Sequence, residues 1–249
     1  MEFTIHWMFY ATAAMYFAGL GAYLLKKPRA TVVLLAAGFI VHTAYLLSRG
    51  WVTGMFIPNY MFDGVLFLPW GIAFFTLIKK ITARDDTPWE STVVMLCFFT
   101  IVALIYPMGI IPPTPKKTII WAPLFFLTEV LGHAGFYCGA WFAMLSLKGK
   151  APESSFHSFV IWGFLAYTVA QIVGAVWCYQ GWAVTFKWGS RHMFSAALWC
   201  YYIIYLHLKF LPAWNTRRKA WFAALGFFVV FALSFSGYLH EMFYPRIGG

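Results

Sequence analysis

The residues best suited to chemistry are histidines and tryptophans gathered in residues 174–207. Two apolar segments there flank a short loop that holds Trp182, Trp188 and His192. A histidine at membrane depth is energetically costly and marks a functional site by default. His207 follows His192 by fifteen residues. On one helix that spacing separates the two rings by roughly 22 Å, so they cannot bind one iron and instead mark two levels of the molecule.

A second candidate site lies in the apolar run from Pro123 to Leu147. Glu129 and His133 stand four residues apart, which places both on one face of a helix. A buried carboxylate needs a partner and commonly orients a metal-bound imidazole, so we expect Glu129 to act on His133. The glycines between Gly132 and Gly139 strip one side of this helix to backbone. That side suits close approach of either another helix or a flat cofactor.

His42 stands alone in the apolar run from Ala30 to about Ser48. A lone histidine on such a helix either hydrogen-bonds a neighbouring helix or serves as a ligand. The sequence leaves both interpretations open.

Composition defines the class of protein. The 249 residues are 62% hydrophobic and 10% charged, with a mean hydropathy of +0.72, which lies far outside the range of soluble domains. The apolar runs suit membrane-spanning helices and lack the alternation of barrel strands. We expect an all-α, polytopic integral membrane protein with about eight transmembrane helices in one domain, residues 1–249. The first apolar run is expected to be a retained span rather than a signal peptide.

The net charge of +10 is explained by the orientation of the chain in the membrane, with most cations on one side. With both termini outside, twelve of the eighteen Lys and Arg residues fall on the inner side, as the positive-inside rule expects, and no nucleic-acid partner is needed. This orientation predicts that the Trp-rich segment, residues 177–193, faces the extracytoplasmic side of the plasma (inner) membrane. The twelve inner residues are Lys26, Lys27, Arg29, Lys79, Lys80, Arg84, Lys148, Lys150, Lys209, Arg217, Arg218 and Lys219.

The four cysteines all fall inside apolar runs, and no C-x-x-C-H sequence occurs. Any haem bound here is therefore not attached covalently to this chain as a c-type haem. We interpret these cysteines as small buried hydrophobic residues. They are Cys97, Cys138, Cys178 and Cys200.

Several motifs in order resemble the CcsA/ResC/CcmC family of haem-handling membrane proteins. The motifs are GFIVHTAYLLSRGW, PNYMFDGVLFLPWGIA, LGHAGFYCGAW, GFLAYTVAQIVGAVWCYQGW, KWGS, LWCYYIIYLH and SGYLHEMF. The resemblance covers nearly the whole chain and is strongest between Gly163 and His240. It implies a Trp-rich outer segment that holds a haem face, two outer histidines as axial ligands, and an embedded histidine below them.

Matched residue by residue, the outer ligands are His133 and His240, and the embedded histidine is His207. The family's Trp-rich segment reads W-G-x-x-W-x-W-D-P, whereas this chain has Gly189 and Ser190 in place of the aspartate and proline. His192 follows as a candidate third outer histidine. The remaining segment residues that match or flank the motif are Trp177, Trp182, Lys187, Trp188 and Arg191.

A haem between helices needs histidine nitrogens, an aromatic cleft for the ring and cations for the propionates. The tryptophans of the segment supply the aromatic cleft, and Lys187 or Arg191 supplies the cation. His207 would take His42 or His157 as its partner. We therefore expect one or two non-covalent b-type haems.

Three functions follow, and the first ranks highest. A cytochrome c assembly protein would hold haem at the outer face for an apocytochrome partner. A b-type electron-transfer subunit would bind a quinone as well. It would pass electrons between quinol and an extracytoplasmic multihaem c-type cytochrome, together with another membrane subunit, and the missing aspartate favours this alternative. A transporter or membrane anchor without a cofactor would need every buried histidine to be a packing residue. In the first two cases the chain is a subunit rather than a stand-alone enzyme.

Overall fold

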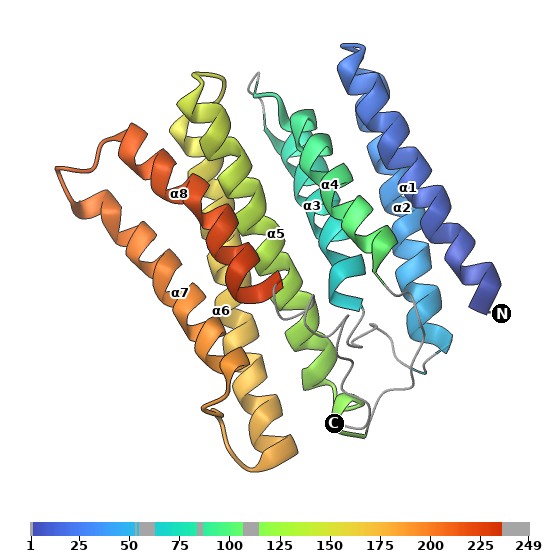
Figure 1. Cartoon of the computed structure of the whole chain (residues 1–249), viewed down its shortest axis with the longest axis vertical. Helices are drawn as coiled ribbons and strands as arrows, with labels where there is room; N and C mark the ends of the chain where they lie inside the picture. Colours follow the sequence, from blue (N-terminus) through green and yellow to red (C-terminus); the bar gives the residue numbers. More distant parts are fainter. Residues whose placement is uncertain (1, 53, 55–62, 84–86, 107–114, 236–249) are drawn as a thin grey trace. The chain divides into compact units, whose positions relative to one another are not determined.

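The computed structural model describes residues 2–52, 54, 63–83, 87–106 and 115–235. The chain divides into two compact units, Met1–Thr118 and Ile119–Gly249, and each contains four α-helices in its described part. Figure 1 shows these helices in chain order. All regular structure in the described residues is helical, which confirms the all-α prediction. One domain over residues 1–249 stays a prediction.

Four helices are long and apolar enough to cross a membrane. Long runs of this composition are typical of multi-pass membrane proteins, as the sequence predicts. These helices are α2 (Pro28–Val52), α3 (Asp63–Thr82, from Gly64), α5 (Trp121–Leu147) and α6 (Glu153–Trp182). The others are α1 (Glu2–Leu24), α4 (Val93–Ile105), α7 (Ser190–His207) and α8 (Thr216–Val230).

In the first unit, α1 packs closely on α2 at Gly38. A Cβ added at Gly38 would lie 2.6 Å from a ring carbon of Tyr16, so only glycine admits this ring. The Tyr16 hydroxyl lies 3.3 Å from Nδ1 of His42, whose ring is fully buried. The rings of Phe9 and Tyr45 flank it, with centroids 5.4 and 6.2 Å away. This histidine therefore sits in an aromatic core.

In the second unit, α5 packs against α6 along its glycine face. A Cβ at Gly135 would lie 2.6 Å from the Cα of Gly163, and one at Gly132 would lie 2.8 Å from the Cβ of Tyr167. Gly139 meets Val160 in the same way. The glycine face of α5 therefore packs against a helix. Of the two interpretations that the sequence left open, another helix or a flat cofactor, the first is correct.

The turn between α5 and α6 is closed by Gly149. This residue has a positive φ of 67° and donates its N–H to the Ser146 carbonyl at 2.9 Å. Lys150 donates its N–H to the Leu145 carbonyl, also at 2.9 Å. This pair of bonds is the Schellman arrangement that ends many helices. It reverses the chain within a few residues, so α6 runs antiparallel to α5.

Helix α7 contacts the α5–α6 pair through polar groups four residues apart. Arg191 reaches Glu129, the Ser195 carbonyl accepts the Tyr167 hydroxyl at 3.4 Å, and the Trp199 indole donates to Thr168 Oγ1 at 3.1 Å. Residues at this spacing lie on one helix face. The contacts therefore form one stripe along α7.

Helix α8 begins with a side-chain cap and ends in a π-helical turn. The Asn215 side chain accepts the backbone N–H of Arg218 at 3.0 Å. After Val230 the chain continues as a π-helical turn over Phe231–Phe235. Such turns are rare and occur frequently at functional sites.

Candidate functional site

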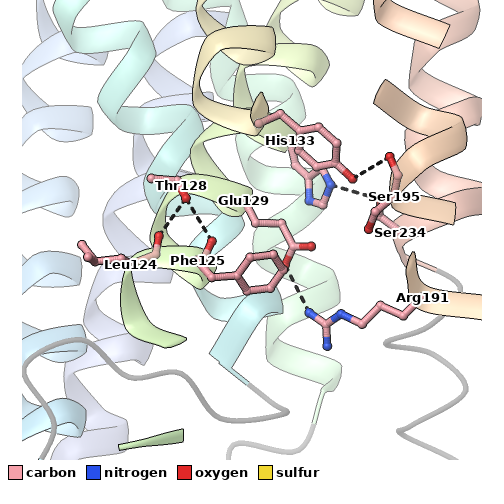
Figure 2. Close-up of polar contacts among 9 residues, drawn as sticks. Leu124, Phe125, Thr128, Glu129, His133, Arg191, Ser195 and Ser234 are labelled. Carbon is pink, nitrogen blue, oxygen red and sulfur yellow. Dashed lines mark hydrogen bonds and ion pairs between the residues drawn. The ribbon is translucent and has the colours of Figure 1, made fainter. Parts of the chain in front are cut away.

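The centre of the site is an ion pair between the buried Glu129 of α5 and the half-exposed Arg191 of α7. Glu129 is only 4% exposed, and its Oε2 accepts a bond from Nη2 of Arg191 at 3.3 Å (Figure 2). The guanidinium lies 5.5 and 5.4 Å from the ring centroids of Phe125 and Phe126. A carboxylate buried here without a cation would be costly. The described contacts thus pair Glu129 with Arg191, whereas we expected His133.

His133 lies one turn further along α5 and is also buried. Its Nε2 is 3.1 Å from Oγ of Ser234, in the π-helical turn (Figure 2). Its ring packs beside that of Tyr167, with centroids 5.3 Å apart. Ser234 precedes His240 by six residues. His240 itself lies outside the described residues, so its pairing with His133 stays a prediction.

Trp177 and Trp182 form an aromatic cluster with the start of α5. The Trp177 ring lies 5.7 and 5.8 Å from those of Phe125 and Phe126. Trp182 packs edge-on against Trp177 at 5.6 Å. Because Arg191 lies over the same two phenylalanines, this cluster adjoins the ion pair.

The loop after α6 carries a second, more exposed aromatic group. Ala183 ends α6 in the left-handed conformation, with φ 57°. Beyond it Trp188, 86% exposed, and His192 each pack edge-on against Phe186, at 5.2 and 5.3 Å. Lys187 places its Nζ 3.9 Å from the ring centroid of Trp182. Both predicted propionate cations are therefore held against aromatic rings.

His207 ends α7, at the opposite end from His192. Its Nδ1 lies 2.7 Å from the carbonyl oxygen of Ile203. Because a carbonyl only accepts, Nδ1 carries a hydrogen in this contact, and in the neutral tautomer of the ring the lone pair is then on Nε2. His157, one expected partner, instead lies 3.2 Å from the hydroxyl of Tyr205.

The structure brings together some predicted residues and leaves others separate. Glu129, His133 and Arg191 share one region of the second unit, whereas His42 belongs to the first unit. In the described parts of the chain, no group of three or more His, Cys, Asp or Glu side chains could hold a metal ion. Haem iron needs only one or two axial ligands from the protein, so this finding is compatible with haem.

Three site residues were not anticipated from the sequence: Tyr167, Ser195 and Ser234. Tyr167 and Ser195 contribute a hydroxyl and a backbone carbonyl to the α6–α7 contact. Hydroxyl and carbonyl groups in apolar helices are too common to signal a site. Ser234 had a weak signal, its position shortly before the SGYLHEMF motif.

Comparison with known proteins identifies the family. The profile of the family described as "Cytochrome C assembly protein" matches residues 60–241, which include Glu129, His133, the Trp-rich segment, His207 and His240. The chain belongs to this family. The resemblance inferred from the motifs is confirmed, and the chain is a multi-pass membrane protein of the cytochrome c assembly type.

Two of the curated relatives are similar to this chain over most of its length, and a third over a shorter segment. The cytochrome c biogenesis protein CcsA of Synechococcus sp. (strain RCC307) is 22% identical over 247 residues, covering 81% of this chain and 79% of that protein. CcsA of Prochlorococcus marinus (strain MIT 9215) is 25% identical over 256 residues, covering 85% and 82%. CcsA of P. marinus (strain MIT 9515) is 36% identical over 76 residues, covering 30% and 24%.

Proposed function

We propose that this assembly protein binds haem b non-covalently beside its Trp-rich segment and presents it to an apocytochrome c. Haem supplies an iron with axial positions for imidazole nitrogens. His133 and His240 are the proposed ligands there. The observation that carries this proposal is the contact between His133 and Ser234, because it brings the end of α8, six residues before His240, onto α5.

The chemistry of the described side chains fits a haem. Trp182 and Trp188 offer partly exposed aromatic faces, and Trp177 supports Trp182 from the α5 side. Lys187 supplies positive charge over the Trp182 ring and Arg191 over the rings of Phe125 and Phe126, where the propionates of a haem could meet them. Glu129 holds Arg191 against the bundle. At the other end of α7, the Nε2 lone pair of His207 is suited to a second iron.

The decisive experiment is a haem assay on detergent-purified protein. A pyridine haemochrome spectrum should show b-type haem, and acid-acetone should extract the pigment. His133→Ala should lose most of the haem, whereas the matched control His6→Ala should retain it. Colourless protein from haem-replete cells would refute the proposal.

We also propose that the Trp-rich segment faces the extracytoplasmic side of the plasma membrane. The excess of Lys and Arg on the opposite side supports this orientation. A reporter fused after Gly249 should be active only in an extracytoplasmic assay. Activity in the cytoplasm would invert the orientation.

A second candidate function is b-type electron transfer from quinol to an extracytoplasmic multihaem c-type cytochrome, with another membrane subunit. Two features favour it: His192 and His207 stand at opposite ends of α7, and Gly189 replaces the aspartate of the family's segment. Two tightly bound haems that quinol reduces would support electron transfer. One labile, quinol-inert haem, with c-type cytochromes left without haem in a deletion strain, would support assembly.

A further inference from the structure

One end of the second unit concentrates positive charge. The antiparallel helices bring the α5–α6 turn and the α7–α8 connector, residues 208–215, to the same end, where Glu153 of α6 binds Thr216 and Lys219 of α8. Figure 1 shows both connections at one end of these four helices. We call this surface the basic end. Its exposed cations are Lys148, Lys150, Lys209, Arg217 and Arg218.

The basic end lacks acidic residues to balance this charge. Glu129 and Glu153 are the only carboxylate side chains in the described residues 119–235. Glu129 pairs with Arg191 near the start of α7. Glu153 is already bonded to Lys219 and Thr216. The five exposed cations therefore attract an external anion.

The connector is held in a fixed conformation. Leu211 donates its N–H to the Leu208 carbonyl at 3.2 Å, and Trp214 donates its N–H to the Leu211 carbonyl at 3.0 Å. The Arg218 guanidinium donates to the Ala213 carbonyl. The connector backbone and the Arg218 guanidinium are thus ordered before any ligand binds, which lowers the entropic cost of binding.

Exposed apolar side chains lie directly beside these cations. Phe210, next to Lys209, is 75% exposed, and Leu211 and Trp221 are also exposed. Apolar groups combined with Lys and Arg at a helix end are typical of a membrane interface, where the cations meet headgroups and the apolar groups enter the acyl region.

We propose that the basic end binds the phosphate of an anionic phospholipid through Lys209 of the connector and Arg217 and Arg218 of α8, with Phe210 and Leu211 against its acyl chains. The charge selects an anionic headgroup, and the adjacent apolar side chains select a lipid over a free phosphate. This inference rests on the membrane class of the protein and not on haem binding. Lys148 and Lys150 extend the same positive surface.

The test measures lipid binding to the purified full-length chain by native mass spectrometry. Phosphatidylglycerol should bind more tightly than phosphatidylcholine. Near an anionic surface each cation contributes about fivefold, so K209Q/R217Q/R218Q should weaken phosphatidylglycerol binding by at least tenfold. Equal binding of the two lipids, or unchanged binding by this variant, would overturn the proposal.

Three controls make the result specific. K209R/R217K/R218K keeps the charge and should retain binding, while K116Q/K117Q removes two cations from the first unit and should leave it unchanged. Circular dichroism reports whether each variant folds. Excess inorganic phosphate should not displace the lipid. Displacement, together with equal binding of glycerol phosphate, would identify a free-phosphate site and overturn the lipid assignment.

Discussion

Helices α6 and α7 contact their neighbours in the second unit by different means. The α5–α6 interface is built from backbone and small residues, with Gly135 against Gly163 and further apolar contacts on either side. Helix α7 combines aromatic packing, such as Tyr202 stacked on Phe136 with ring centroids 3.5 Å apart, with polar contacts at Arg191, Ser195 and Trp199. Any change in side-chain volume destabilises a closely packed interface. A polar contact, in contrast, can be lost or replaced separately from its neighbours.

The difference separates an interface of small residues from one that also contains polar contacts. The α5–α6 pair carries the buried Glu129 and His133. Helix α7 carries His192 and His207 and follows directly on the Trp-rich loop.

The largest effect is expected from Gly135→Leu, which tests the α5–α6 interface. A Cβ at this position already meets the Gly163 backbone, so the larger side chain should separate the helices at a cost above about 3 kcal/mol. We expect little folded protein by size-exclusion chromatography. Gly21→Ala, in a helix where a Cβ meets nothing within 4 Å, should fold normally. Equal yields of both variants would show that the interface is not tightly packed.

A smaller effect is expected from Arg191→Ala, which tests the polar stripe. Breaking a fully buried ion pair costs about 3–5 kcal/mol, but the Arg191 side chain is 52% exposed, so a loss of about 2 kcal/mol is expected. The midpoint temperature of thermal unfolding in detergent should fall by about 5 °C. Glu129→Gln removes the buried charge, and adding it to Arg191→Ala should restore part of the loss. Strictly additive losses would contradict coupling between the two residues.

The smallest effect is expected from Trp199→Phe. This change removes the bond to Thr168 and keeps a ring against Phe164, so about 1 kcal/mol should be lost. Trp162→Phe, at an exposed position on α6, is the matched control and should change stability very little. If the two variants have the same melting temperature, the contact of Trp199 with Thr168 contributes nothing to stability.

The helices themselves could be predicted well from the sequence. The apolar run predicted from Ala30 to about Ser48 is the helix Pro28–Val52, and the run predicted from Pro123 to Leu147 is the helix Trp121–Leu147. Long apolar runs between polar turns fix the position of helices, because the backbone must satisfy its own hydrogen bonds where water is absent.

The partners of the site residues could not be predicted in the same way. Glu129 and Arg191 stand 62 residues apart, and only tertiary packing selects that cation over a histidine four residues away. The bare face around Gly135 fits a helix or a flat ligand equally well, so the glycine pattern alone could not decide. The π-helical turn at Phe231–Phe235, which carries Ser234, could not be predicted because no amino-acid pattern distinguishes it from an α-helix.

The Gly149 turn also bears on the order of folding during synthesis. Because its two hydrogen bonds reverse the chain within a few residues, α5 and α6 are neighbours in sequence as well as in space. Contacts of low sequence separation form fastest, and elements made earlier fold before later ones. The α5–α6 hairpin can therefore assemble while α7 is still in the ribosome. Helix α7, with His192 and His207, then packs against this preformed hairpin.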